Sequence, residues 1–235
     1  MRSRLLKPTL LHLLLAVGGI TMILPFLWMV STSLKPEDQI FRFPPVWIPS
    51  TWEWGNYTEA MQAANFGRYF INTVIYAGAV TMSNLVLCSM AAYAFARLRF
   101  RGREVLFILV LGTMMIPGQV TMVPVFIMLK HWPLLGGNGW LGSGGHGLLN
   151  SYPGLVLPSA VGAFGIFLLR QFFITLPREL EDAARIDGCS EAGIYWRIIL
   201  PLSRPALATL GIFTFTAAWN EFLWPLLITS KDSMK

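Results

Sequence analysis

The chain has 235 residues, of which 54% are hydrophobic and only 13% are charged. So few charges cannot cover the surface of a water-soluble protein of this length, which excludes an ordinary soluble domain. The net charge of +6 could suit a nucleic-acid-binding protein, but the placement of the basic residues fits membrane topology better. Cys88 lies in an apolar stretch and Cys189 in a charged one, so no disulfide framework is predicted.

Five apolar segments are long enough to cross a hydrocarbon core about 30 Å thick, which takes about 20 helical residues. The first three contain no charged residue, the fourth contains only Arg170 and the fifth only Glu221. We therefore predict an all-α, polytopic membrane helix bundle. The predicted spans cover residues 10–33, 69–96, 105–129, 153–176 and 205–228.

The basic residues predict the orientation of these spans. With a cytoplasmic N-terminus, the run RLRFRGR at 97–103 and the segment 178–204 face the cytoplasm, where Lys and Arg concentrate. The connections 35–68 and 130–152 are then external. The second contains GGNGWLGSGGHG, which lacks the Lys-Ser/Thr ending of a phosphate-binding loop and predicts a flexible connection. Six basic residues fall outside: Lys35, Arg42, Arg68, Lys130, Lys231 and Lys235.

The segment 177–201 is unusually charged for such a chain, because nine of the 30 charged residues lie between positions 178 and 204. Its pattern predicts two short helices joined by a glycine. Pro177 suits the first helical position, Gly188 a left-handed helix end and Ser190 an N-cap, while Pro201 should stop the second helix.

Leu180, Ala183 and Ala184 are predicted to share one face of the first of these helices. Two adjacent alanines make that face thin, so another protein could approach it closely. Spacing alone supports a solvated amphipathic loop about as well as it supports a surface that binds another protein.

The string ELEDAARIDGCSEAGIYWRIILPLSRPAL resembles the Glu-Ala-Ala loop of ABC importer permeases. In that family the loop forms a coupling helix that docks into a groove of a cytoplasmic ATPase subunit. Asp182 stands where the family usually has Glu, which keeps the charge on a shorter side chain. The resemblance implies these coupling residues: Glu181, Asp182, Ala183, Ala184, Asp187, Gly188, Ile198, Leu200 and Pro201.

The resemblance covers the whole chain. The strings LPFLWMVSTSLKPEDQIF, FINTVIYAG, AAYAFARLRFRG and WNEFLWPLLITS resemble carbohydrate-importer permeases related to the smaller permease of the maltose system, and glycerol-phosphate importers share the pattern. It implies a type I importer fold, with residues 1–68 as an N-terminal helix and external connection and residues 69–235 as the transmembrane core. Such permeases usually have six spans, so the five predicted here suggest a truncated reading frame or a fragment.

The same resemblance implies the partners. They are a second homologous permease, a cytoplasmic ATPase dimer that binds ATP and Mg²⁺, an extracytoplasmic solute-binding protein and the bilayer of a bacterial or archaeal inner membrane. No cofactor and no nucleic acid is expected on this chain.

Asn220 and Glu221 form a strongly polar pair within the fifth span. An intramembrane carboxylate is costly and usually faces a cavity or a partner, so the pair could line the translocation path. Alternatively, Glu221 lies close enough to the outer end to be structural. The histidines are scattered without metal-ligand spacing, and no catalytic motif is found, which favours a transport subunit over an enzyme. A membrane-embedded enzyme and a stand-alone ion-coupled transporter remain the alternatives.

Overall fold

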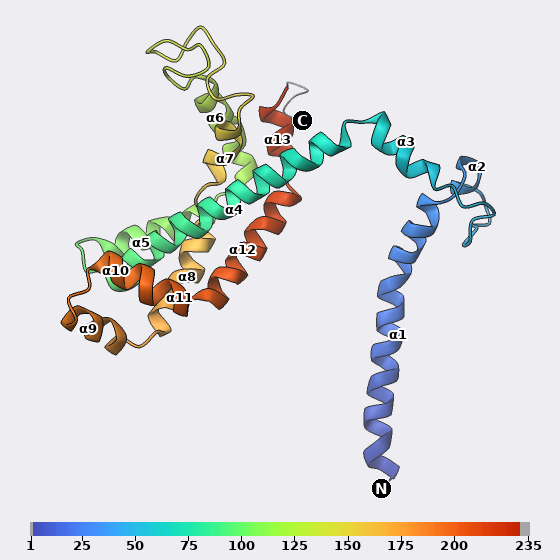
Figure 1. Cartoon of the computed structure of the whole chain (residues 1–235), viewed down its shortest axis with the longest axis horizontal. Coiled ribbons are helices and arrows are strands. Elements are labelled where there is room, and N and C mark those ends of the chain that lie inside the picture. The colour runs from blue at the N-terminus through green and yellow to red at the C-terminus, as the bar shows by residue number, and fades with distance from the viewer. Residues whose placement is uncertain (1, 231–235) are drawn as a thin grey trace. The chain divides into compact units, whose positions relative to one another are not determined.

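The computed structural model describes residues 2–230, with side chains from Thr9 onward except Leu10. Lys231 and Lys235, which are predicted to be external, lie outside this range. Every regular element in residues 2–230 is helical, which confirms the all-α prediction (Figure 1). The chain divides into two compact units, Met1–Gly67 and Arg68–Lys235, which are described separately.

The first unit is a long apolar helix followed by a connection that folds onto its end. In α1 (Arg2–Ser33) the stretch Leu11–Ser33 is long and apolar enough to span a membrane, and none of its most apolar window is buried inside the chain. Lys35 is buried at its end, with Nζ 3.8 Å from the centroid of the Trp28 ring. Asn56 in α3 (Gly55–Ala63) donates hydrogen bonds to the carbonyls of Ser33 and Lys35 at that end. The short helix α2 (Glu37–Ile40) lies between α1 and α3 in the sequence.

The second unit is built along α4 (Phe66–Arg97), a continuous helix of 32 residues (Figure 1). Helix α8 packs against both α5 and α12, and α13 packs against α6 and α7. The remaining elements are α5 (Arg103–Thr113), α6 (Gly118–Lys130), α7 (Tyr152–Val156), the 3-10 turn η1 (Leu157–Ser159), α8 (Ala163–Thr175), α9 (Glu179–Ile186), α10 (Glu191–Ile194), the π-helical turn η2 (Tyr195–Ile199), α11 (Leu200–Leu202), α12 (Arg204–Trp219) and α13 (Leu223–Ile228).

Only two of the described helices are long and apolar enough to cross a membrane unaided, and five spans result if each of three bent helix pairs counts as one. The α5–α6 pair bends by 99° at a break that contains Pro117, as expected where proline interrupts the ladder. The second pair joins α7 and η1 to α8 with a bend of 48°.

The fifth apolar segment differs from the single helix predicted at 205–228. Helix α12 ends at Trp219, and α13 begins only at Leu223. Upstream, the segment from Glu191 to Leu202 joins α12 across a bend of 77°. The upstream helical segment ends at Leu202, one residue after the predicted stop at Pro201. The turn that precedes Pro201 is π-helical, which fits a proline that offers no N–H to the carbonyl four residues earlier.

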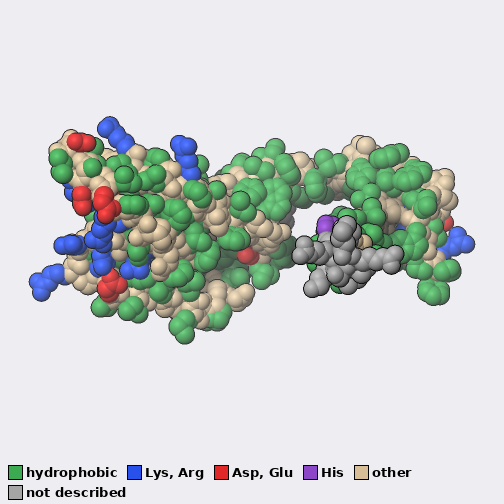
Figure 2. All heavy atoms as spheres, turned by 90° about the horizontal axis from the view of Figure 1, so that it is seen from below, with side chains coloured by type: hydrophobic (Ala, Val, Ile, Leu, Met, Phe, Trp, Pro, Cys, Tyr) green, Lys and Arg blue, Asp and Glu red, His purple; other side chains and the backbone are tan. Residues whose placement is uncertain are grey.

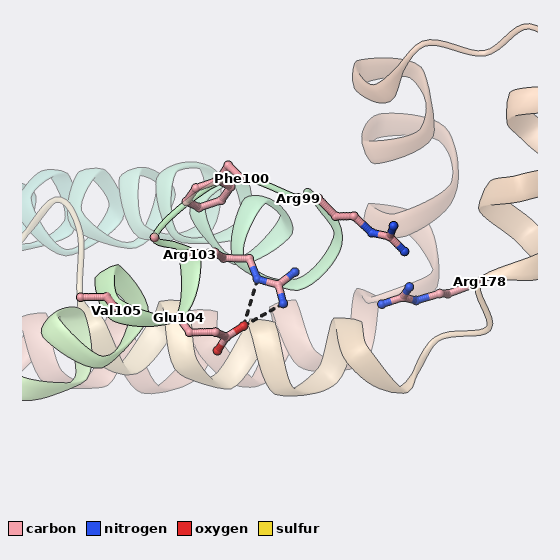
Figure 3. Close-up of a pocket in the computed structure, with 7 residues that line it drawn as sticks. Arg99, Phe100, Arg103, Glu104, Val105 and Arg178 are labelled. Atoms are coloured by element: carbon pink, nitrogen blue, oxygen red, sulfur yellow. Dashed lines mark hydrogen bonds and ion pairs between the residues drawn. The ribbon is translucent and has the colours of Figure 1, made fainter.

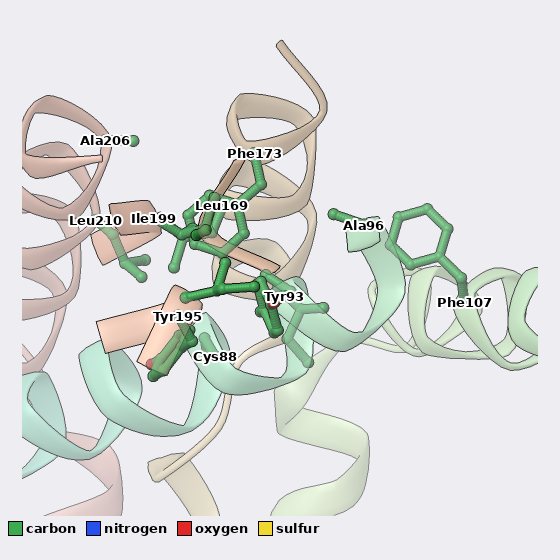
Figure 4. Packing of buried hydrophobic residues seen from close by; sticks show 14 residues of the cluster. Cys88, Tyr93, Ala96, Phe107, Leu169, Phe173, Tyr195, Ile199, Ala206 and Leu210 are labelled. Atoms are coloured by element: carbon green, nitrogen blue, oxygen red, sulfur yellow. The ribbon is translucent and has the colours of Figure 1, made fainter. Parts of the chain in front are cut away.

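Two hydrophobic clusters hold the second unit together. The first joins α4, α5, α8, α9, η2 and α12 through side chains such as Cys88, Leu169, Phe173 and Ile199, each at most 1% exposed (Figure 4). The second joins α4, α6, α7, α12 and α13 around Trp224. Long-range packing, rather than the apolar pattern alone, thus decides which faces of the helices are buried.

The connection 130–152, which is predicted to be external, is folded on itself, unlike the flexible loop that its glycine content predicts. Asn138 is buried, and its side-chain amide donates hydrogen bonds to the carbonyls of Lys130 and Trp132. The Oδ1 atom of the same amide accepts a hydrogen bond from the N–H of Gly145. A side chain at Gly145 would collide with the neighbouring backbone. Glycine here permits close packing of the loop.

Gly165 allows α8 to approach α4 and α12 closely. A Cβ atom there would lie 3.0 Å from the Cys88 Sγ and 3.1 Å from the Leu210 Cδ1. We expect Gly165→Val to lower the free energy of unfolding by about 1–3 kcal/mol, the usual cost of overfilling a packed core. Denaturant unfolding of the purified chain in detergent measures this. Gly78→Val in α4 is the control, because nothing lies within 4 Å of its added Cβ; equal losses in both variants would contradict the close packing.

Candidate functional site

The segment 177–201 folds as two short helices around a left-handed glycine, as predicted. Gly188 has φ +81°, its N–H donates to the carbonyl of Arg185, and the N–H of Cys189 donates to that of Ala184. These two bonds form a Schellman motif that satisfies the last carbonyls of α9. Ser190 caps α10 by accepting from the N–H of Gly193. The predicted start is wrong, because α9 begins at Glu179 and leaves Pro177 outside the helix.

A buried ion pair fixes α9 to the rest of the unit. Nε of Arg97, the last residue of α4, lies 2.9 Å from Oε1 of Glu181, and the two side chains are only 2% and 3% exposed. This contact is ionic, without the alignment of a hydrogen bond. Arg97 also donates from Nη2 to the carbonyls of Phe173 and Leu176 at the end of α8. One guanidinium thus joins the ends of α4 and α8 to the first turn of α9, and it suits the negative end of the α8 dipole.

The outer face of α9 differs from the predicted one. Ala184 is 8% exposed and belongs to the first hydrophobic cluster, so it faces the chain's own core. Ala183 and Leu180 remain exposed, and Ile186 is 87% exposed. The helical period places Glu181 and Ala184 on one side, where the ion pair and the cluster bury them. The apolar surface open to a partner therefore comprises Leu180, Ala183 and Ile186.

Arg185 connects the two short helices. Its guanidinium lies 3.0 Å from Asp182 and 2.9 Å from Glu191, and Glu191 also accepts a hydrogen bond of 2.7 Å from Tyr93 in α4. The hydrogen bond from Arg185, reinforced by that from Tyr93, lowers the pKa of Glu191. The same contact with Glu191 raises the pKa of Arg185. These groups are largely exposed, so water screens them and they orient α9 more than they stabilise it.

The remaining predicted coupling residues divide between core and surface. Ile198 and Leu200 pack against the first hydrophobic cluster and so anchor the segment inside the chain. Asp187 and Pro201 are exposed. Figure 2 shows the acidic and basic side chains gathered at the end of the second unit that carries α9.

Glu221 lies at the break between α12 and α13, where its Oε1 accepts a hydrogen bond from the N–H of Trp224. Its side chain lines three open cavities with volumes of about 390, 460 and 350 Å³. Glu221 thus makes a structural contact and also borders open space, and its place on the translocation path stays a prediction. Asn220 donates to the carbonyl of Thr216 within its own helix and lines none of these three cavities.

Other polar residues lining the cavities were not identified from the sequence. Asn84 donates to the carbonyl of Ser159, and Asn72 accepts from the hydroxyl of Tyr152. Tyr76 lines two of the cavities. Polar residues recur along α4, and this recurrence within an apolar span is the sequence signal that could have identified them.

Arg170 is held inside the unit. Its guanidinium lies 4.0 Å from the centroid of the Phe107 ring and 3.4 Å from Glu104, and its Nε donates to the carbonyl of Phe95. These contacts join α8 to α4 and α5.

A membrane helix bundle with a charged, rigidly attached pair of short helices at one end is the architecture of an importer permease. Residues 84–234 match the family model of binding-protein-dependent transport system inner membrane components, and the chain belongs to this family.

Similar proteins include the sn-glycerol-3-phosphate transport system permease UgpE of Yersinia enterocolitica, which is 36% identical over 95% of this chain and 76% of the relative. The diacetylchitobiose uptake system permease NgcG of Streptomyces coelicolor is 33% identical over 93% and 68%. The arabinooligosaccharides transport system permease AraQ of Halalkalibacterium halodurans is 34% identical over 90% and 72%. A crystal structure of a bacterial ABC transporter involved in alginate import matches with a TM-score of 0.82 and 25% identity, covering all of this chain and 78% of the other.

These comparisons make the chain a permease subunit of a binding-protein-dependent importer with a type I importer permease fold. A membrane-embedded enzyme and a stand-alone ion-coupled transporter are thereby set aside.

We expect Glu181→Ala to destabilise the chain by about 3–5 kcal/mol, because it leaves Arg97 as an uncompensated buried charge. Denaturant unfolding in detergent measures the loss. The double variant Arg97→Met/Glu181→Leu should recover much of it, since it removes both charges. Asp182→Ala is the control: its exposed carboxylate should contribute less than about 1 kcal/mol. A Glu181→Ala loss as small as that of the control would contradict the buried pair.

Proposed function

We propose that α9 is the coupling helix, which docks onto a separate cytoplasmic ATPase through Leu180, Ala183 and Ile186. The observation that carries this proposal is the 87% exposure of Ile186 on a helix in which four of the eight residues are charged. Burial of this isoleucine in a groove of the partner would contribute favourable binding free energy. Because the ion pair and the Schellman motif hold α9 in one position, movement of the ATPase would pass to α4 and α8 rather than be lost in a flexible loop.

The mechanism follows from this attachment. ATP binding and hydrolysis on the ATPase dimer would displace α9 together with the ends of α4 and α8. The bent spans would then tilt between outward-open and inward-open states. ATP and Mg²⁺ would be held by the partner, and this chain would need no cofactor.

The cavities around Glu221 would form this chain's share of the translocation path. Their lining is mostly apolar and aromatic, as at Phe213 and Trp219, with a few hydroxyl and amide groups such as those of Tyr76 and Asn72. None of the residues that line these three cavities is Lys, Arg or His, and Glu221 is their one carboxylate. Such a lining favours an uncharged, hydroxyl-rich carbohydrate and disfavours a phosphate-bearing cargo, although one similar permease is named for sn-glycerol-3-phosphate.

The other partners follow from the family. A second homologous permease would complete the path. An extracytoplasmic solute-binding protein would deliver cargo to the connections 35–68 and 130–152. The chain would lie in the inner membrane of a bacterium or archaeon with its N-terminus and α9 on the cytoplasmic side.

The orientation is tested by alkaline phosphatase fusions, which are active only outside the cytoplasm. A fusion after Gly144 should be active, and one after Arg101 should be silent, because the positively charged turn is retained inside. The reverse pattern would invert the proposed topology.

For the coupling helix, we expect Ile186→Asp to weaken co-purification of the ATPase by about tenfold or more, because a carboxylate would have to be buried in an apolar groove. Ala192→Asp, which adds the same charge at an exposed position of α10, should leave co-purification unchanged. If both variants retained the ATPase equally, α9 would not be the docking helix.

The cargo class is tested with the complete transporter in proteoliposomes. A panel of neutral disaccharides should contain one that stimulates ATP hydrolysis, whereas glycerol 3-phosphate should not. Glu221→Gln should reduce transport of that disaccharide by about tenfold, because the variant would lose the binding free energy of one hydrogen bond between the cargo and a charged group. Stimulation by glycerol 3-phosphate alone would contradict an uncharged cargo, while leaving the ATPase-coupled function intact.

A further inference from the structure

Another cavity lies away from the three that surround Glu221. It has a volume of about 620 Å³ and lies between the turn that joins α4 to α5 and the segment leading into α9 (Figure 3). Arg99, Arg103 and Arg178 line it together with a single carboxylate, that of Glu104. This end of the bundle therefore carries a concentrated positive charge around a hollow.

Two of the three guanidinium groups are available to a ligand. Arg103 is engaged, since its Nε and Nη2 lie 3.0 and 2.7 Å from Oε1 of Glu104. Arg99 and Arg178 are exposed, and within residues 2–230 neither forms an ion pair. In Figure 3 their guanidinium groups extend towards each other from different segments.

The nearby carboxylates do not neutralise these two arginines. Glu181 is paired with Arg97, and Asp182 is paired with Arg185. An anion from outside the chain would therefore meet uncompensated charge, and guanidinium groups bind phosphate through paired hydrogen bonds.

The cavity also has an apolar side, which continues into a strip of exposed apolar side chains along α5. Val105 lines it and is 63% exposed, and the next exposed side chains along α5 are Leu106, Ile108 and Leu109. A soluble anion has no apolar part that could bury these side chains. A phospholipid would place its acyl chains along α5 and its phosphate between the arginines.

We propose that this cavity binds the headgroup of an anionic phospholipid, with Arg99 and Arg178 holding the phosphodiester. Basic pockets beside transmembrane helices recognise such headgroups in this way. A bound lipid would bridge the α4–α5 turn and the segment before α9, and so would stabilise the position of the coupling helix.

The test uses the purified full chain in a non-ionic detergent, with bound lipid counted by native mass spectrometry. The probe is dioleoyl-phosphatidylglycerol, compared with uncharged dioleoyl-phosphatidylcholine. Arg99→Gln/Arg178→Gln should lower the affinity for phosphatidylglycerol by about 30-fold, roughly fivefold for each arginine. Arg101→Gln/Arg204→Gln is the matched control, because it removes the same charge from two exposed arginines that do not line the cavity.

Selective loss in the first variant, without loss in the control, supports the lipid site. Equal losses would overturn it in favour of general electrostatic attraction. A second arm adds inorganic phosphate: displacement of the lipid by millimolar phosphate would reassign the cavity to a free anion. If the first variant bound lipid normally but no longer co-purified with the ATPase, an acidic partner surface would replace the lipid.

Discussion

The contact between Arg97 and Glu181 is the constraint on which the coupling end of the molecule depends. Burying a charge is costly unless a partner of opposite charge compensates it. The positions of Arg97 and Glu181 at the end of α4 and in the first turn of α9 therefore cannot separate cheaply. Since Arg97 also binds the last carbonyls of α8, three helices of different direction meet at one side chain. A short surface helix becomes a rigid extension of the membrane core.

The opposite end of the bundle is organised differently. There the helices are interrupted, and the break between α12 and α13 places one carboxylate beside three cavities. The broken backbone is tolerated because side chains and neighbouring segments satisfy it, as with the bond from Trp224 to Glu221. The importer thus combines a stiff connection where force would enter with interrupted helices where cargo would pass.

The sequence predicted much of this, for identifiable reasons. Span positions follow from apolar runs, and Gly188 and Ser190 follow from local backbone chemistry that acts over a few residues. The burial of Ala184 could not be predicted, because the helical period defines a face without saying what covers it. The Arg97–Glu181 pair joins residues 84 positions apart, and Arg97 was interpreted only as a topology signal. Likewise, the folded loop around Asn138 depends on contacts that glycine content does not specify.

The most direct test of the rigid connection is a distance measured during the transport cycle. In the assembled transporter, with Cys88 and Cys189 replaced by serine, spin labels are placed at Arg101→Cys in the α4–α5 turn and at Glu179→Cys in α9. Double electron–electron resonance then reports their separation with and without bound ATP. The structure predicts an unchanged distance, because the ion pair makes these segments move together. A change of about 5 Å, the rise of one helical turn, would show that α9 moves independently of α4 and would contradict the account.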